Sequence, residues 1–168
     1  MAKRGAKWQK DEVKAKSVSK APGKEWQPVM LMGESQHNMD AKGRVTIPSK
    51  YREELGETFY VSKGLDGCLT LYSEAQWLLR VERINACPEA QAKNIRRFVF
   101  AATEKVTADK QGRILISPAL RAHAGLVKDI TVIGAGLTAE IWDTERWQKY
   151  NEDMSTADIE ADMAALQI

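Results

Sequence analysis

An internal repeat constrains this chain more than any other feature, because two copies of one unit must adopt similar structures and must pack together. The segment 40–48 matches the segment 109–117 at an offset of 69 residues, and each begins with Asp-x-x-Gly-Arg followed by a mainly aliphatic run. The register then shifts by one residue, so that Trp77 matches Trp147. Matching residues at the start and at the end of the repeat indicate two copies of one structural unit.

Each copy is predicted to begin with a turn that enters a strand. The glycine of the motif can adopt a positive φ, and the aliphatic run that follows favours extended structure. Pro48 and Pro118 end the strand and start a short amphipathic helix, which Gly56 and Gly125 terminate. A β-hairpin with glycines in its turn follows in each copy. The predicted strands are 44–47, 58–62 and 68–72 in the first copy, with hairpin strands 130–133 and 139–142 in the second.

Two longer helices are predicted after the first hairpin. Ser73 and Gln76 have capping-box spacing, so a helix starts there. Asp143 occupies the equivalent capping position in the second copy. Pro88 interrupts the chain before a further helical pattern that joins the two copies. The apolar face of the first helix is predicted to hold Trp77, Leu78, Val81 and Ile84, and that of the joining helix Ile95, Phe98, Val99 and Ala102.

The fold class follows from the small size of each unit. A few short strands cannot bury enough apolar surface alone, whereas two related units that pair about a pseudo-twofold axis can close a common sheet. We therefore expect one two-lobed α+β body with flanking helices.

Charge is distributed unevenly along the chain. The first 28 residues hold eight basic and three acidic side chains, a net charge of +5, whereas the remainder holds 17 basic and 20 acidic ones, a net charge of −3. Residues 1–28 are therefore interpreted as a basic disordered arm, with an upstream start or leader as the alternative. Because the rest is slightly acidic, a nucleic-acid site there must come from local placement of arginines.

The sequence does not support a membrane protein, a disulfide-stabilised protein or a metal-binding protein. No apolar run is long enough to cross a bilayer, and the N-terminal segment lacks the apolar centre of a signal peptide, so the expected location is the cytoplasm. The two cysteines, Cys68 and Cys87, are expected to be reduced and partly buried, since no second pair could form a zinc cluster or a disulfide framework. No metal, cofactor or small-molecule substrate is expected.

The two motifs and their flanks resemble the MraZ family of bacterial regulators, which are built from two SpoVT/AbrB-type swapped-hairpin units. The likeness rests on the two Asp-x-x-x-Arg turns, on Pro48–Arg52 and on Leu120–Leu126, and it covers about residues 31–168. The resemblance implies a barrel-like body and no enzymatic activity. It also implies ring-shaped homo-oligomers that associate with the nucleoid and bind repeated sites on double-stranded DNA. Those sites lie upstream of the division and cell-wall gene cluster, which the regulator usually represses together with its own promoter.

The resemblance and the repeat divide the chain into five segments. They are the arm at 1–28, a first unit at 31–87, a connecting helix at 88–103, a second unit at 104–153 and a C-terminal tail at 154–168. Within the tail, Ile159, Met163 and Leu166 have helical spacing, which indicates a terminal helix that packs on a neighbour or on the chain itself.

Arginines at the starts of the strands are the candidate DNA-binding residues. An arginine placed just after a tight turn can direct a planar fork of donors at a phosphate or at the guanine edge, and a nearby lysine adds phosphate affinity. The first turn is expected to make the main contacts with DNA, because its basic residues lie closer together in the sequence than those of the second turn. The candidate DNA-binding residues are Lys42, Arg44, Lys50, Arg52, Lys110, Arg113 and Arg121.

The acidic and glycine positions of the two motifs are assigned to the turns themselves. An aspartate would repel DNA, so Asp40 and Asp109 are expected to cap the turns and to orient the arginines, with Gly43 and Gly112 at the bends. Alternatively, each Asp–Arg pair is purely structural and fixes the interface between the copies.

Two other functional classes stay open. One aspartate per copy is also how paired-carboxylate hydrolases are built, but here lysine and arginine lie beside each aspartate and favour its ionised form. The two histidines, His37 and His123, have no catalytic or metal-ligand spacing and are expected at the surface. An antitoxin-like or assembly module of the same fold is the second alternative.

Overall fold

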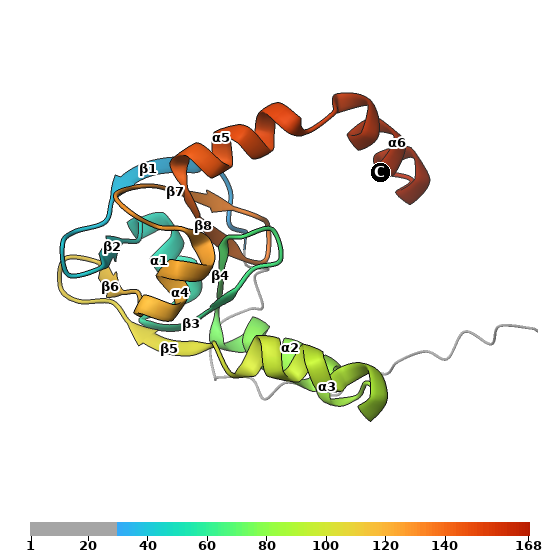
Figure 1. The fold of residues 1–168 in the computed structure, drawn as a ribbon, viewed down its shortest axis with the longest axis horizontal. Helices are drawn as coiled ribbons and strands as arrows, with labels where there is room; N and C mark the ends of the chain where they lie inside the picture. Colours follow the sequence, from blue (N-terminus) through green and yellow to red (C-terminus); the bar gives the residue numbers. More distant parts are fainter. Residues whose placement is uncertain (1–29) are drawn as a thin grey trace, which may run out of the picture.

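The computed structural model describes residues 30–168, so the predicted basic arm lies outside the described residues. Within this range the chain forms eight strands and six helices (Figure 1). The strands are β1 (Glu34–Asn38), β2 (Arg44–Thr46), β3 (Thr58–Lys63), β4 (Leu69–Tyr72), β5 (Glu104–Thr107), β6 (Arg113–Leu115), β7 (Asp129–Gly134) and β8 (Ala139–Asp143). The helices are α1 (Ser49–Leu55), α2 (Glu74–Asn85), α3 (Glu89–Phe100), α4 (Pro118–Ala124), α5 (Thr144–Asp153) and α6 (Thr156–Leu166).

Six strands from both copies form one antiparallel sheet in the order β1-β7-β8-β4-β3-β5. The order is symmetric, since β1, β3 and β4 of the first copy occupy positions equivalent to β5, β7 and β8 of the second. Each outer strand pairs with the other copy: β1 lies beside β7, and β5 lies beside β3. The two copies therefore exchange their edge strands, and neither sheet half is complete without the other.

The remaining two strands, β2 and β6, pair with each other as a separate antiparallel ribbon. Val45 and Ile114, at the centres of these strands, are almost fully buried, and so are Tyr51 of α1 and Leu120 of α4. All four belong to one hydrophobic core that draws on both copies. The ribbon and the two short helices are thus anchored by a shared core rather than by separate ones.

Most predicted elements are confirmed. The five strands that were predicted with bounds begin and end within one residue of the observed ones. Ser73 accepts a hydrogen bond from the backbone N–H of Gln76 at 3.3 Å, and Asp143 accepts one from that of Arg146 at 3.1 Å, so both predicted caps are present.

The prediction that α2 buries Leu78 is wrong, because its side chain is 59% exposed. Successive helical residues are separated by about 100°, which leaves Trp77, Val81 and Ile84 on one face and turns Leu78 away from it. α3 packs against the buried face, where Val99 joins Trp77 and Ile84 in a second apolar cluster. Ile95 and Phe98 of α3 are 45% and 36% exposed, so the predicted stripe is only partly covered.

The helices that follow the two copies differ. α3 folds back against α2, whereas α6 extends away from the sheet and contains no buried residue (Figure 1). The predicted terminal helix is present, but the expectation that it packs on the chain itself is wrong, because Ile159, Met163 and Leu166 are exposed; packing on a neighbour stays a prediction. Among residues 30–168, no helix combines the length and the apolar composition that a bilayer crossing requires.

Candidate nucleic-acid interface

The first turn is closed by Asp40 and displays Arg44 at the start of β2. The carboxylate oxygen Oδ1 of Asp40 accepts hydrogen bonds from the backbone N–H groups of Lys42 and Arg44, both at 2.9 Å. Its other oxygen, Oδ2, accepts one from the Arg44 Nε at 2.6 Å. Gly43, with a φ of +82°, provides the bend that the turn requires. One aspartate thus holds both the backbone of the turn and the arginine side chain.

The second turn repeats this arrangement. Oδ1 of Asp109 accepts from the backbone N–H groups of Gln111 and Arg113, both at 2.9 Å, and Oδ2 accepts from the Arg113 Nε at the same distance. Gly112 has a φ of +77°. The repeat therefore extends from sequence to hydrogen bonding.

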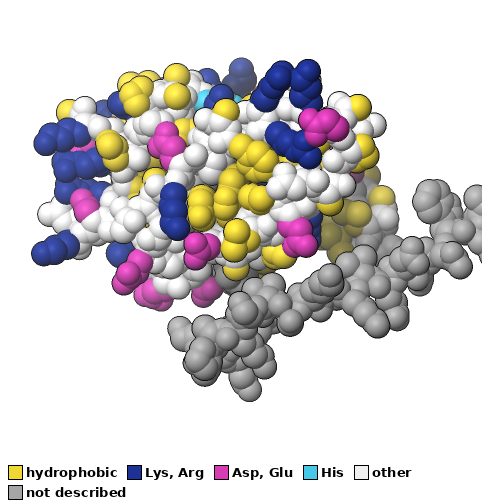
Figure 2. Space-filling model, turned by 90° about the horizontal axis from the view of Figure 1, so that it is seen from below, with side chains coloured by type: hydrophobic (Ala, Val, Ile, Leu, Met, Phe, Trp, Pro, Cys, Tyr) yellow, Lys and Arg dark blue, Asp and Glu magenta, His cyan; other side chains and the backbone are white. Residues whose placement is uncertain are grey.

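The β2–β6 ribbon places the two turns at the same end of the molecule. Arg44 lies opposite Leu115 in the ribbon, and Thr46 lies opposite Arg113. In Figure 1 both turns are at the left, and Figure 2, which keeps left and right, shows lysine and arginine side chains gathered at that end. The fold thus converts two motifs 69 residues apart into one basic surface on an otherwise slightly acidic body.

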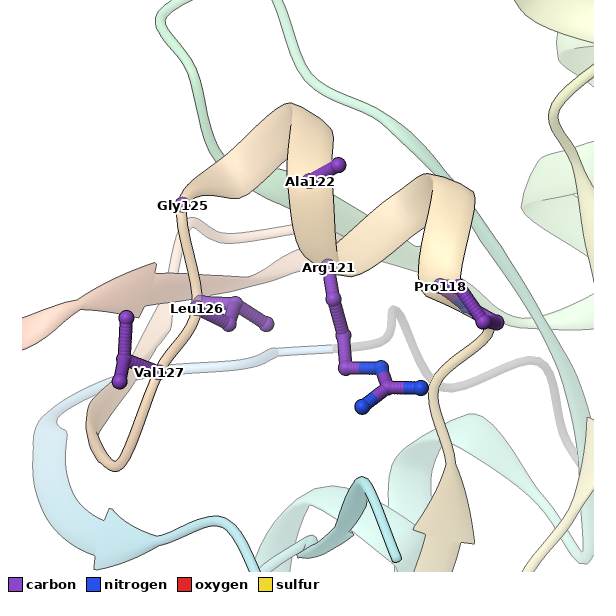
Figure 3. Close-up of a pocket in the computed structure, with 6 residues that line it drawn as sticks. All are labelled: Pro118, Arg121, Ala122, Gly125, Leu126 and Val127. Atoms are coloured by element: carbon purple, nitrogen blue, oxygen red, sulfur yellow. The ribbon is translucent and has the colours of Figure 1, made fainter.

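Two of the candidate arginines lie behind the turns rather than on them. Arg52 extends from α1 to the turn of the second copy, where a Cβ on Gly112 would be 2.8 Å from its Cζ. Arg121 extends from α4 to the first turn, where a Cβ on Gly43 would be 2.9 Å from its Cζ. Figure 3 shows Arg121 pointing away from α4, beside a shallow cavity of about 410 Å³. The residues that line this cavity are Pro118, Arg121, Ala122, Gly125, Leu126 and Val127.

Lys50 is directed elsewhere. Its Nζ lies 4.8 Å from the centre of the Tyr51 ring, in a cation–π arrangement, and close to the backbone of Gly33. The structure therefore groups six of the seven candidate basic residues around the two turns and sets Lys50 apart. That these residues bind DNA stays a prediction.

Both aspartates are held in their ionised form. The backbone N–H of Arg44 is the largest cause that lowers the pKa of Asp40 below its ordinary value of 3.8, and the Arg44 side chain adds to it. The backbone N–H of Arg113 lowers the pKa of Asp109 in the same way. A shared-proton carboxylate pair requires one raised pKa, so these aspartates do not have the electrostatics of a hydrolase dyad.

The histidines and cysteines differ in their surroundings within the part of the chain that the structure describes. His123 is half-buried, and its Nε2 lies 2.8 Å from the carbonyl oxygen of Gly64 in the other copy, so it is not a purely surface residue. Cys68 is buried, which raises its pKa to about 12, and Cys87 is exposed. Within residues 30–168, no three histidine, cysteine or acidic side chains come close enough to hold a metal ion.

The sequence interpretation missed how each turn depends on the other copy. The N–H of Ile47 donates to the carbonyl oxygen of Gly112, and the N–H of Ile116 donates to that of Gly43, both at 2.9 Å. The motif glycines signal a bend, but they do not reveal which distant residues lie against them. Only the fact that Arg52 and Arg121 are equivalent in the repeat hinted at a common role.

Comparison with known proteins gives one consistent result. The family model described as "MraZ protein, putative antitoxin-like" matches residues 30–97 and again residues 99–167. Proteins named "Transcriptional regulator MraZ" are similar to this chain over most of their length. The relative from Heliobacterium modesticaldum is 50% identical over 125 residues, which cover 73% of this chain and 87% of the relative. The relative from Acetivibrio thermocellus is 47% identical over 144 residues, covering 83% of this chain and all of the relative.

The double match of the family model coincides with the two copies that the repeat and the symmetric sheet define. Two adjacent matches cover nearly all of the described residues, and the relatives share close to half of their residues with this chain over more than two thirds of its length. The chain belongs to the MraZ family.

Proposed function

We propose that this chain is a DNA-binding transcriptional regulator that uses the two Asp-x-x-Gly-Arg turns as its reading surface. The observation that carries the proposal is the presentation of two turns with matching hydrogen bonds at one end of the body, each displaying a partly exposed arginine. The names of the relatives, which call those proteins transcriptional regulators, support it.

The chemistry of the turns fits a DNA ligand. Arg44 donates Nε to Asp40, whereas Arg113 places both Nε and Nη2 at 2.9 Å from Oδ2 of Asp109. Each guanidinium is oriented in advance by its aspartate, and its remaining N–H donors suit a phosphate or the O6 and N7 atoms of guanine. Lys42 and Lys110 are exposed in the same turns, where they suit phosphate contacts.

The finer expectations from the family resemblance form part of the proposal. The regulator represses the division and cell-wall gene cluster and its own promoter, binds tandem sites as a ring-shaped homo-oligomer and associates with the nucleoid in the cytoplasm. Leu78, Ile95 and Phe98, exposed on α2 and α3, support contacts with a second copy of this chain. A barrel-like body is supported by the β2–β6 ribbon, since β1 contacts β2 and β5 contacts β6 at opposite edges of the sheet.

Charge-matched variants test the proposal. Selection from a randomised pool of double-stranded DNA should enrich a repeated motif with the unmodified chain. Arg44→Ala should lower the affinity for that motif by about tenfold or more, since a good base contact contributes about 1–3 kcal/mol. Arg113→Ala should act less strongly, because the first turn is the denser basic site.

Arg83→Ala is the matched control, because Arg83 is exposed on α2, away from the turns, and the variant loses the same charge (Figure 1). Thermal melting of all three variants checks the fold. Failure to enrich any motif would contradict DNA reading. Equal losses in Arg83→Ala and Arg44→Ala would show that only net charge matters.

The antitoxin-like alternative finds some support in the description of the matching family and in the exposed apolar residues of α6. An antitoxin would bind one defined protein through that helix. Deleting residues 154–168 would then abolish the partner complex while leaving DNA binding intact. The paired-aspartate hydrolase has no comparable support.

A further inference from the structure

We propose that Arg52 and Arg121 are positioning residues, each of which holds the DNA-reading turn of the opposite copy. The proposal rests on the function proposed above and assigns these two arginines a role other than direct contact with DNA. It also links the two reading turns, so that neither copy can form a complete site alone.

Each turn glycine accepts a backbone hydrogen bond from the opposite copy. Ile47 follows β2 and donates its N–H to Gly112 of the second copy, whereas Ile116 follows β6 and donates to Gly43 of the first. Each glycine precedes a reading arginine, Arg113 or Arg44. The position of each arginine is therefore set partly by backbone that belongs to the other copy.

A guanidinium packs against each of these two glycines. The Cζ and Nε of Arg52 are both 2.8 Å from where a Cβ on Gly112 would lie, and the Cζ of Arg121 is 2.9 Å from the corresponding point on Gly43. Real Cβ atoms do not approach other atoms so closely, so the guanidinium occupies space that only glycine leaves free. Both contacts join a helix of one copy to the turn of the other.

Arg52 is further anchored by its own copy. Its Nε donates to the carbonyl oxygen of Ile47 at 3.0 Å, and Ile47 is the residue whose N–H binds Gly112. The Arg52 side chain thus contacts both residues of the hydrogen bond between Ile47 and Gly112. The Nε of Arg121 is buried and has no hydrogen-bond partner among the described residues, so its contact with Gly43 depends on packing alone.

Packing supports this division of roles. Lys42 and Lys110 are exposed in the turns; Arg52 and Arg121 are half-buried, as Arg44 and Arg113 are, but they lie against the backbone of the opposite copy's turn. A residue that contacts phosphate releases a counterion, and each such contact adds about 0.9 to the slope of log affinity against log salt. A positioning residue affects affinity without contributing to that slope.

The first test needs no DNA. Hydrogen exchange of the full free chain, followed by mass spectrometry, reports the stability of each turn separately. Arg52→Ala should accelerate exchange several-fold in residues 109–113 and leave residues 40–44 unchanged. Arg121→Ala should do the reverse. Glu53→Gln, an exposed neighbour of Arg52 on α1, should change neither turn.

The second test is a salt titration of DNA binding. Arg52→Ala should lower the affinity by about tenfold at every salt concentration without changing the slope, whereas Lys42→Ala should reduce the slope by about one. Arg52→Lys should not restore affinity, because lysine keeps the charge but lacks the Nε donor and the planar group.

The outcomes separate this inference from the proposed function. If the unmodified chain binds no DNA, the function fails, and hydrogen exchange still decides the positioning role. A reduced salt slope in Arg52→Ala, with unchanged exchange at 109–113, would show direct phosphate contact and overturn the inference. Faster exchange throughout the chain would overturn it too, since Arg52 would then support the whole fold.

Discussion

At the residue scale, the turns depend on aspartates that stay ionised beside arginine. Asp40 and Asp109 each accept two backbone hydrogen bonds and one from a guanidinium, an arrangement that only the carboxylate form can satisfy completely. Their negative charges lie under the turns and balance part of the basic surface. Each arginine therefore gains a fixed direction while the remaining N–H donors of its guanidinium stay available for a ligand.

The pH dependence of the turns follows from these bonds. Since the folded-state pKa values of Asp40 and Asp109 lie below the ordinary 3.8, the stabilisation is present above that value and is lost as the pH falls through the folded-state pKa. NMR titration of the carboxyl carbons should give midpoints below 3.8 for both residues.

The Arg44→Ala variant provides the control for this titration. It should raise the midpoint of Asp40, because the side-chain hydrogen bond and the opposite charge are removed, and it should leave Asp109 unchanged. A midpoint of Asp40 at or above 3.8 in the unmodified chain would contradict the hydrogen-bonded geometry.

Local contacts were the predictable part of the candidate site. Asp40, Gly43 and Arg44 lie within five positions, so turn chemistry alone indicates how they combine. The packing of Arg52 on Gly112 joins residues 60 positions apart in different copies. No local pattern encodes such a contact, because it exists only once β2 and β6 have paired.

At the scale of elements, the β2–β6 ribbon is the part on which both turns depend. Ile114 is 1% exposed and Leu115, the next residue of β6, is 58% exposed. Replacing Ile114 by alanine should lower the free energy of unfolding by about 2–5 kcal/mol, because it leaves a cavity in the shared core.

Leu115→Ala is the matched variant and should change the free energy of unfolding by less than about 0.5 kcal/mol. Denaturant unfolding at one fixed protein concentration measures both, since any association would make stability concentration-dependent. Equal losses for the two variants would mean that Leu115 is covered in solution.

The outer strands show why part of the fold escaped prediction. β1 has the sequence ESQHN, with no apolar alternation, and β5 contributes only Val106 as an aliphatic side chain. Their extended conformation comes from pairing with β7 and β3 of the other copy rather than from their own composition. The central strands were predictable because their side chains alternate between apolar and polar or are mostly apolar, as in β4 around Leu69 and in β8 around Ile141.

At the scale of the whole molecule, the weak net charge of the body bears on how DNA is held. Residues beyond position 28 carry a net charge of −3, and one chain presents a single pair of small basic turns. A single chain should therefore bind DNA weakly. Several chains in one assembly would present several pairs of turns, and each later contact would form at a high effective concentration.

This avidity requires that successive DNA repeats face the same side of the duplex, which places their centres about 10 base pairs apart or at a multiple of that spacing. Inserting five base pairs between adjacent repeats should therefore lower the affinity sharply, because it rotates one repeat to the opposite side. Inserting ten should cost much less, since the repeat returns to the original side. Gel-shift titration of the native, plus-five and plus-ten probes measures the difference. Equal affinity for all three would show that the turns bind independently, and the multimeric mode of binding would then be wrong.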